Sequence, residues 1–500
     1  MKKKAVAIAM SSLLVLSLGT TAFAADSQSS SEIKAKIEGG YTVTIPATID
    51  LGTVSAEDFT LKSFQTSDYG VAEDAYQYMV DADFDIKVDG WYGDNQYVKV
   101  TTGKEATLTD SGSDATVPVS VYPYERAFDK ADTKTSTVTL YKDDAQPGDF
   151  TGTATFDIEL VTYDTESGIE KALSYWSFTW DRTMTYYDGD VAKATAAMAE
   201  LGYDALSYQG NQDEAALKEL GLGMAEVQQV TEPADIIAKA AQLKNDGIAF
   251  DNFKVTFSAD EIDGLAANAE NVNANYGPYW ETMVQKAVDF NIALKQAADD
   301  AGYGEIDFWC TIEKEPMGNA FESPLEIAMF VQDVARRTED LGYENYVTHC
   351  IDLGHTYSYL DLGLGTATTE AAVEYFNTQD WAKALFYNSP YFGTLEVKAP
   401  ADIYEYMSLC KGYVKCIQFF DNNGSTFMGG KASGSHVGLG KGRIDYMAYM
   451  DALCNVAEFD GNYWVYEPWY NESGVDITED VNEGVMWMTE WNLLYAVDEI

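Results

Sequence analysis

Basic residues are scarce in this 500-residue chain. Lysine and arginine total 32 against 81 aspartates and glutamates, which gives a formal net charge of −49 and a pI near 4.1. A surface with this charge repels phosphate backbones and anionic lipid, so we expect no nucleic-acid partner and disfavour phosphorylated substrates. The acidic balance is typical of a solvated surface suited to an extracellular protein.

Histidine and cysteine are also few, with 3 and 5 residues. The cysteines form an odd set confined to the second half of the chain, and Cys310, Cys350 and Cys416 stand inside apolar strand candidates. This placement predicts buried thiols rather than a disulfide framework. His349 also stands inside a strand candidate and is expected to be a packed core residue.

Long apolar runs are absent after residue 24. Residues 1–24, MKKKAVAIAMSSLLVLSLGTTAFA, combine an N-terminal lysine cluster, an apolar run and small residues at Ala22 and Ala24, which predicts a secretory signal peptide cleaved after Ala24. No later stretch is apolar enough for long enough to cross a bilayer. We therefore expect a secreted, extracellular protein that does not span a membrane.

Residues 25–168 show almost no helical periodicity. Short alternating runs recur there between Gly, Asp and Ser turns, including YTVTIPATIDL, DFDIKV, YVKVTT and GTATFDIELV. This pattern is typical of an all-β sandwich. Its two edges, VTIPATIDLG and PGDFTGTATFDIEL, resemble the β-sandwich modules of Gram-positive surface proteins, a resemblance that implies association with the cell surface through this domain. Helix formers begin near TYDTESGIEKA and mark the end of the sandwich.

Residues 169–500 repeat one pattern, in which a helix ends in glycine, a tyrosine follows and a strand begins. Gly202, Gly302, Gly342 and Gly412 occupy the position of a helix C-cap in these repeats. Repeated helix–strand units of this length predict an α/β (β/α)8 TIM barrel. The region holds one more strand candidate than a barrel needs, so either MAEVQQV (224–230) or KALFYNS (383–389) is expected to lie outside it.

Polar side chains stand where several predicted barrel strands end. They are Asp181, Glu313, Asp352, His355, Gln418, Asp421 and Glu467. Because parallel strands bring their carboxyl ends to one face of a barrel, we expect these groups to converge. Two or three carboxylates with one nitrogen or amide ligand would hold a divalent ion, with Mn²⁺ or Mg²⁺ favoured and Zn²⁺ also compatible.

Four segments in this region resemble one family. IDLGH ends in His355, QFFDNNG leads into HVGLGKGRIDY, GNYWVYE ends in Glu467, and IDFWCTIE ends in Glu313. Taken in chain order, with IDFWCTIE first, they resemble the strand ends of the xylose isomerase-like TIM barrels, the superfamily of sugar phosphate isomerases and epimerases. The resemblance covers residues 306–467.

The resemblance implies specific roles for these residues. The metal ligands would be Glu313, Asp352, Gln418 and Glu467, and this chain carries Gln418 where the family has a histidine. Glu313 and Glu467 would be the catalytic pair that moves a proton next to a carbonyl, with Glu315 as a substitute for the first ligand. The residues assigned to substrate binding are His355, Asp421, His436 and Arg443.

The implied activity is isomerisation or epimerisation of a carbohydrate. The ion would polarise a ketose or aldose carbonyl and its neighbouring hydroxyl, which lowers the cost of an enediolate. Two other classes stay open. A glycoside hydrolase would also use two carboxylates on a barrel, and a non-catalytic surface protein would bind a small carbohydrate or glycan, with Gln418 marking a lost metal site. Bound metal distinguishes the isomerase from both.

Overall fold

The structure is a computed structural model that describes residues 14–19, 32–36, 41–61, 78–90, 95–165, 167–174, 190–208, 214–258, 261–262, 265–313, 320–363, 368–422, 436–468 and 478–498. The chain divides into two compact units. The first comprises the described residues up to Gly168 together with those from Thr489 onward, and the second comprises Ile169–Met488.

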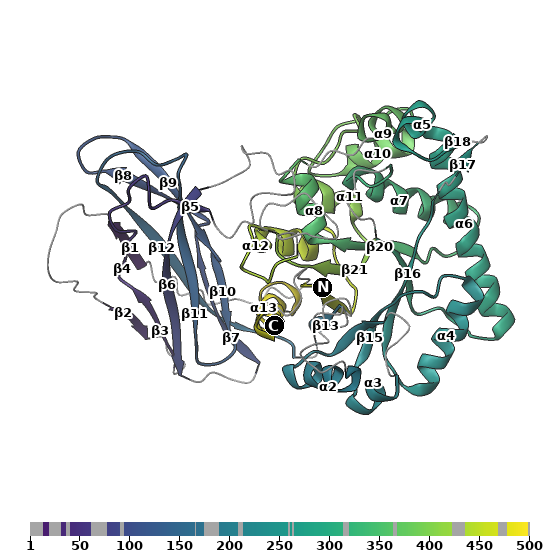
Figure 1. Cartoon of the computed structure of the whole chain (residues 1–500), viewed down its shortest axis with the longest axis horizontal. Helices are drawn as coiled ribbons and strands as arrows, with labels where there is room; N and C mark the ends of the chain where they lie inside the picture. The colour runs from purple at the N-terminus through teal and green to yellow at the C-terminus, as the bar shows by residue number, and fades with distance from the viewer. Residues whose placement is uncertain are drawn as a thin grey trace, which may run out of the picture. The chain divides into compact units, whose positions relative to one another are not determined.

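The first unit is a β domain (Figure 1). Its strands are β1 (Leu14–Gly19), β2 (Glu32–Lys36), β3 (Tyr41–Pro46), β4 (Thr48–Ile49), β5 (Thr60–Leu61), β6 (Tyr78–Gly90), β7 (Gln96–Thr102), β8 (Glu105–Asp110), β9 (Thr116–Tyr122), β10 (Glu125–Phe128), β11 (Asp132–Tyr141) and β12 (Phe150–Thr162). All pairs are antiparallel except β1 with β4. Burial alternates along β3 and β9, because successive side chains point to opposite faces of a sheet.

The last described residues of the chain belong to this β domain. Glu490 is 4% exposed, and its carboxylate accepts hydrogen bonds from Arg126 Nη1 at 3.0 Å and from the backbone N–H of Ala127 at 2.9 Å. Leu493 packs in one cluster with Tyr97 and with neighbouring apolar residues. The C-terminal segment therefore contributes both charge and apolar surface to the first unit.

The second unit is a closed barrel of eight parallel strands (Figure 1). In barrel order they are β13 (Glu170–Leu173), β14 (Ala205–Tyr208), β15 (Gly223–Val227), β16 (Phe250–Val255), β19 (Trp309–Ile312), β20 (Val347–Asp352), β21 (Val414–Phe419) and β22 (Tyr463–Tyr466). The first and last strands pair in parallel and close the ring. An antiparallel β domain followed by a TIM barrel confirms the predicted fold class.

The structure decides which of the predicted segments form barrel strands. MAEVQQV supplies β15, whereas KALFYNS lies in the helix α10 (Asp380–Asn388), so the second of the two candidates is the one outside the barrel. The first barrel strand, β13, falls in the segment whose composition favoured helix, because pairing with β14 and β22 overrides a weak local propensity. YWSFTW (175–180), the apolar run that precedes the predicted strand end Asp181, lies outside the described residues.

Helices connect the strands of the barrel. They are α2 (Val191–Leu201), α3 (Glu214–Leu220), α4 (Pro233–Asp246), α5 (Ala269–Ala274), α6 (Tyr276–Ala301), α7 (Pro324–Asp340), α8 (Leu353–Leu360), α9 (Thr369–Phe376), α10, α11 (Ile403–Cys410), α12 (Tyr446–Asp451) and η3 (Ala452–Val456), with a small hairpin of β17 (Glu261–Ile262) and β18 (Leu265–Ala266). Two more helices, α13 (Thr478–Trp491) and η4 (Asn492–Ala496), follow the last barrel strand, and η4 belongs to the first unit. Gly202 and Gly302 cap α2 and α6 with φ of 96° and 65°, as predicted. Among the described helices, none has the length and apolarity needed to cross a membrane.

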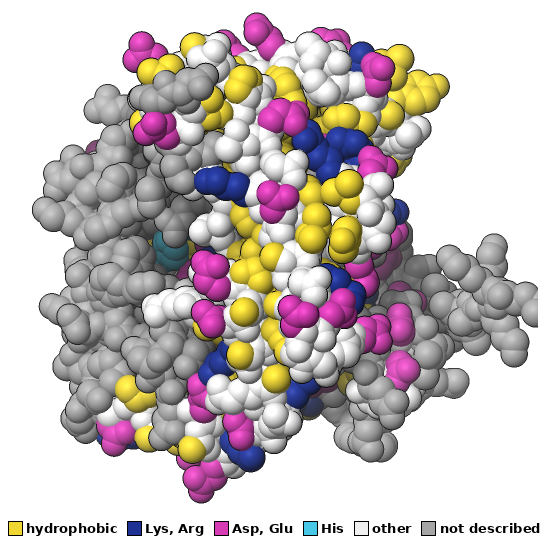
Figure 2. Space-filling model, turned by 90° about the vertical axis from the view of Figure 1, so that its right-hand side faces the viewer, with side chains coloured by type: hydrophobic (Ala, Val, Ile, Leu, Met, Phe, Trp, Pro, Cys, Tyr) yellow, Lys and Arg dark blue, Asp and Glu magenta, His cyan; other side chains and the backbone are white. Residues whose placement is uncertain are grey.

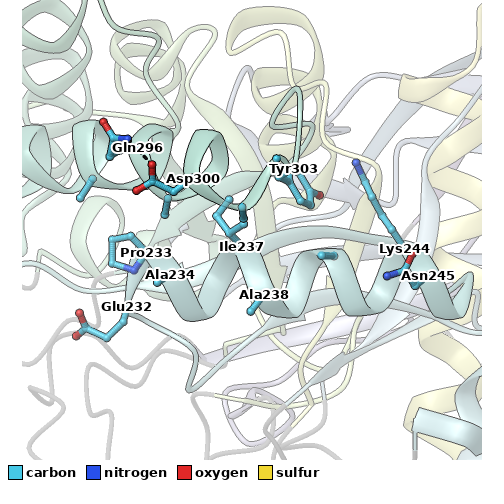
Figure 3. A pocket seen from close by; sticks show the side chains of 15 residues that line it. Glu232, Pro233, Ala234, Ile237, Ala238, Lys244, Asn245, Gln296, Asp300 and Tyr303 are labelled. Carbon is cyan, nitrogen blue, oxygen red and sulfur yellow. Dashed lines mark hydrogen bonds between the residues drawn. The ribbon is translucent and has the colours of Figure 1, made fainter.

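The outer face of the barrel helices carries acidic side chains with basic and apolar ones among them (Figure 2). A groove of about 870 Å³ runs between α4 and α6 on this outer layer, and Figure 3 shows Glu232, Lys244 and Asp300 around small apolar residues such as Ala238. The groove is lined by residues of α4 and α6 and of the turns next to their ends, and none of the strand-end residues considered below lines it.

Candidate functional site

The four predicted metal ligands come from four consecutive barrel strands. Glu313 follows β19, Asp352 ends β20, Gln418 lies in β21 and Glu467 follows β22. All four are buried, with exposed fractions between 1% and 8%. Asp352 and Gln418 are direct partners in the β20–β21 register, and the backbone N–H of Glu467 donates to the Phe419 carbonyl at 2.9 Å. The barrel thus brings these groups to its carboxyl end.

Asp352 caps the N-terminus of α8 with one of its two carboxylate oxygens. Its Oδ1 accepts the backbone N–H of His355 at 3.0 Å as a helix N-cap, whereas Oδ2 is buried without a hydrogen-bond partner. Burial, and then the negative charge of Glu467, raises the pKa of Asp352 well above its usual value, against the backbone hydrogen bonds, which lower it. A bound cation would relieve this unfavourable burial of charge.

Two histidines lie beside Asp352. Ligand atoms of Asp352, His355 and His436 all lie within 4.8 Å of one another, and both ring nitrogens of His355 are buried without a hydrogen-bond partner. Burial lowers the pKa of His436 to about 3 and, together with nearby positive charge, lowers the pKa of His355 well below its usual value. Both rings are therefore neutral near pH 7, the form that binds metal, so this cluster could hold a divalent ion.

Phe420 fixes the orientation of the two imidazoles. Its ring stacks on His436 with centroids 3.5 Å apart, and it meets His355 edge-on at 5.1 Å. His349 lies apart from this cluster, buried in β20 against Tyr406 at 6.3 Å between ring centroids. The expectation that His349 is a packed strand residue is confirmed.

Glu313 has a partner that the sequence analysis missed. Its Oε2 forms an ion pair with Lys254 Nζ, which projects from β16 and is largely buried, with its side chain 22% exposed. The Lys254 ammonium also acts on Asp352, since it is one of the charges that lower the pKa of that residue. The signal available in the sequence was a single lysine within the apolar run FKVTFS.

Glu467 is oriented by a residue that follows the neighbouring strand β13, and Gln418 by a residue of β15 on the other side of the barrel. The fully buried Ser174, which follows β13, donates from Oγ to Glu467 Oε1 at 2.7 Å. Gln418 Nε2 lies 3.0 and 3.2 Å from the two carboxylate oxygens of Glu226 in β15, which leaves Gln418 Oε1 buried without a hydrogen-bond partner. The sequence indicated Glu226 only as an acidic residue inside the apolar run GMAEV. No pattern in the sequence indicated that Ser174 belongs to the site.

Asp421 anchors the glycine-rich turn that carries His436. Its carboxylate accepts the backbone N–H groups of Asn422 at 2.8 Å, Gly440 at 3.0 Å and Ile444 at 3.2 Å. A Cβ at Gly442 would come within 2.0 Å of Asp421 Oδ1, so the turn requires glycine there. Burial raises the pKa of Asp421 to about 6, opposed by those backbone hydrogen bonds.

Arg443 belongs to the same turn. Its backbone N–H donates to the Asn422 carbonyl at 2.8 Å, and its side chain is half-buried. Contact of Asp421 or Arg443 with a substrate stays a prediction. Asp181 and Glu315 lie outside the described residues.

Comparison with known proteins gives fold similarity only. No family model matches the chain, and no curated protein matches it. Among solved structures, a xylose isomerase-like TIM barrel/4-hydroxyphenylpyruvate dioxygenase fusion protein is 11% identical with a TM-score of 0.39, covering 65% of this chain and 44% of that one. The chain therefore spans less than half the length of that protein.

Two further structures are similar at the same level. A xylose isomerase domain protein from Planctomyces limnophilus is 12% identical over 66% of this chain and 98% of that one, with a TM-score of 0.34. A β-mannanase from the blue mussel Mytilus edulis is 11% identical over 64% of this chain and 92% of that one, with a TM-score of 0.25. The chain is a TIM barrel with low-identity structural matches to xylose isomerase-like proteins, preceded by an antiparallel β domain.

Proposed function

We propose that the barrel is a sugar isomerase or epimerase that moves a proton next to a carbonyl of a carbohydrate with the help of a divalent ion. The observation that carries the proposal is the cluster of Asp352, His355 and His436 at the carboxyl end of the barrel, whose ligand atoms lie within 4.8 Å of one another. Asp352 Oδ2 and both ring nitrogens of His355 are buried there without a hydrogen-bond partner. Buried polar groups without partners are costly, and a functional ligand is one explanation of their presence.

The donor set fits a borderline divalent ion. The unpaired Asp352 oxygen and the neutral imidazoles of His355 and His436 would hold it, and carboxylate with imidazole suits Mn²⁺ or Zn²⁺ better than Mg²⁺. The set predicted by resemblance shares Asp352 with this cluster. When bound, the ion would polarise the carbonyl and the adjacent hydroxyl of the substrate.

Glu313 and Glu467 have the asymmetry that an acid–base pair requires. The Lys254 ammonium stabilises negative charge on Glu313, which suits the residue that accepts a proton from the substrate carbon. Ser174 orients Glu467 through Oε1, which suits the residue that returns a proton. The stacked rings of Phe420 and His436 would form an apolar wall beside the sugar.

A metal-free carbohydrate-binding protein is the second candidate. The Lys254–Glu313 ion pair favours it, because a cation of the protein already neutralises the first predicted ligand. The amide nitrogen of Gln418 is also committed to Glu226. In this alternative the barrel binds a small carbohydrate or glycan without chemistry.

Metal analysis and proton exchange separate the two candidates. We expect purified protein to carry one divalent ion at the Asp352–His355–His436 cluster and to lose thermal stability in chelator. We also expect it to exchange deuterium from solvent into a bound ketose or aldose. Asp352→Asn should abolish binding of this ion and the deuterium exchange, whereas Asp380→Asn, a change at a side chain that is 99% exposed, should leave both intact. Sugar binding without stoichiometric metal or exchange would reject the isomerase and support the second candidate.

We also propose that the protein is exported after cleavage following Ala24. Cleavage there would remove β1 and leave Thr151–Phe156 of β12 without that partner. Intact mass measured on protein from culture medium should correspond to a chain that begins at Ala25. A retained N-terminus on cell-associated protein would contradict this proposal.

A further inference from the structure

A second cluster of metal-ligating groups lies inside the barrel. Glu226 of β15, Cys350 of β20 and Cys416 of β21 place ligand atoms within 4.8 Å of one another. Cys350 and Cys416 are direct partners in the β20–β21 register, and Cys350 Sγ lies 3.8 Å from Glu226 Oε1. All three residues are at most 1% exposed. The cluster is therefore enclosed by the barrel wall.

Glu226 is a buried carboxylate without a cationic partner in the described part of the chain. Its hydrogen-bond partners there are the Gln418 amide and the Cys350 thiol, both of which are neutral donors. No ion pair with lysine, arginine or histidine joins it within the described residues. A buried carboxylate that is held by neutral donors alone is a favourable position for a cation.

Gln418 supplies a fourth donor. Its Nε2 is 3.0 Å from Glu226, while its Oε1 is buried and without a hydrogen-bond partner, on a side chain that is 1% exposed. An amide oxygen with free lone pairs is a competent ligand. Two sulfur and two oxygen donors would give the four-coordination that zinc prefers, and both thiolate and carboxylate are zinc ligands.

We propose that Glu226, Cys350, Cys416 and Gln418 form a metal site for a thiophilic ion such as Zn²⁺. On binding, each thiol releases its proton to solvent and the sulfur donates a lone pair to the ion, so no oxidation or reduction takes place. The donors are softer than the carboxylate and imidazoles of the Asp352 cluster, so the two sites would take different ions. The inference stands whether or not the barrel is an isomerase.

Cobalt substitution tests the site in the full-length protein. Protein produced in cobalt-supplemented medium should show a thiolate-to-cobalt charge-transfer band in the near ultraviolet. We expect Cys350→Ser and Cys416→Ser each to lose the band and one equivalent of metal. Cys310→Ser is the matched control, because Cys310 is also fully buried and lies on the neighbouring strand β19.

Two further measurements keep the test decisive. Asp352→Asn should retain the charge-transfer band, since this change affects only the cluster of Asp352, His355 and His436. Loss of the band in Asp352→Asn would overturn the assignment. X-ray absorption of zinc-loaded unaltered protein should report sulfur neighbours of the metal, which needs no variant to fold. A metal with only nitrogen and oxygen neighbours, or protein that carries no thiolate-bound ion, would overturn the proposal.

Discussion

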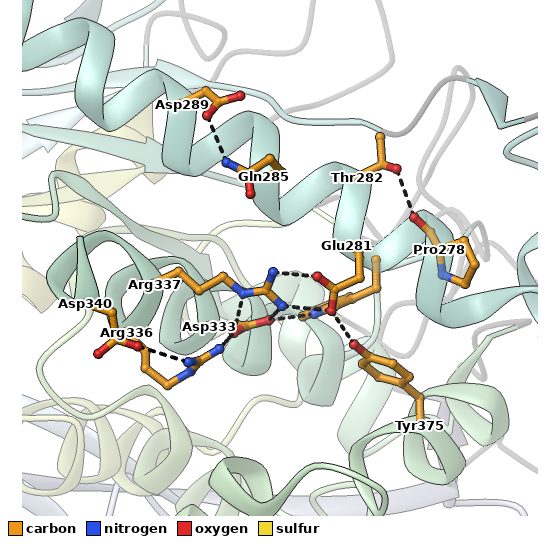
Figure 4. Close-up of polar contacts among 11 residues, drawn as sticks. Pro278, Glu281, Thr282, Gln285, Asp289, Asp333, Arg336, Arg337, Asp340 and Tyr375 are labelled. Carbon is orange, nitrogen blue, oxygen red and sulfur yellow. Dashed lines mark hydrogen bonds and ion pairs between the residues drawn. The ribbon is translucent and has the colours of Figure 1, made fainter.

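Two fully enclosed aspartates of the barrel unit have opposite environments. Asp333 of α7 accepts bonds from Arg336 Nη2 at 2.6 Å, from Arg337 Nε and Nη2 at 2.9 Å, and from Trp280 Nε1 at 3.0 Å (Figure 4). Asp352 is held by backbone N–H groups at the start of α8, and its Oδ2 has no hydrogen-bond partner and lies 3.5 Å from Nε2 of the neutral His355 ring. The first arrangement stabilises the packing of helices, whereas the second retains binding capacity at a cost in stability.

A third aspartate lies between these extremes. Asp251 of β16 is 4% exposed and accepts only neutral donors, the backbone N–H of Asn462 at 3.2 Å and its Nδ2 at 2.7 Å. Burial raises the pKa of Asp251 to about 6, although these hydrogen bonds lower it. Hydrogen bonds alone therefore leave part of the charge penalty uncompensated, and cations remove more of it.

The largest effect on stability is expected from neutralising Asp333, the aspartate paired with two arginines. Asp333→Asn should lower the free energy of unfolding of the barrel by about 3 kcal/mol, because charge-assisted bonds to two arginines are lost. Urea titration of the full chain measures this change. Asp340→Asn is the control, since Asp340 is 70% exposed and forms an ion pair with Arg336 at 3.3 Å, so its effect should stay below about 1 kcal/mol. Equal effects from the two variants would reject the comparison.

Asp251, which accepts hydrogen bonds from neutral donors, should make the stability of the barrel depend on pH. The pKa of Asp251 is about 6 in the folded state and lower in the unfolded chain, so between roughly pH 4 and 6 the folded state binds more protons and stability falls as pH rises. Asp251→Asn should remove this slope. Relative to the unaltered protein, the variant should gain about 3 kcal/mol across that window. Urea titrations at several pH values measure the difference, and parallel stability curves for the two proteins would contradict it.

Asp352 should behave in the opposite way to Asp333. Asp352→Asn should weaken Mn²⁺ or Zn²⁺ binding by at least ~100-fold, yet change the stability of metal-free protein by no more than ~1 kcal/mol, because no paired charge is lost. Calorimetric titration with the ion and melting in chelator measure the two quantities. A large loss of stability without metal would show that Asp352 is a structural residue.

The smallest effect concerns Lys254, whose ammonium group lies beside Glu313. Lys254→Met should tighten binding of a divalent ion by about 10-fold, since removal of the ammonium ends its repulsion of the ion and its competition for Glu313. Lys254→Arg keeps the charge and should leave affinity close to that of the unaltered protein. Unchanged affinity in Lys254→Met would place the ion away from Glu313.

The candidate site was predictable where a residue stands in a local pattern. Asp352 and His355 were identified because they follow a strand and begin a helix, and His436 because it opens a glycine-rich turn. Lys254, Glu226 and Ser174 were not, since each is an isolated polar residue on a strand distant in sequence from its partner. Their contacts with Glu313, Gln418 and Glu467 exist only after the barrel closes.

Sequence alone determined the two-part fold class, the glycine caps of α2 and α6 and the buried state of Cys310, Cys350 and Cys416. These features depend on periodicity, backbone conformation and hydrophobicity, which act over a few residues. Tertiary structure alone decided that β13 is a strand and that Gln418 faces Glu226. Ring closure joins strands far apart in sequence, so the pairing and charge of each buried group depend on neighbours that no local pattern specifies.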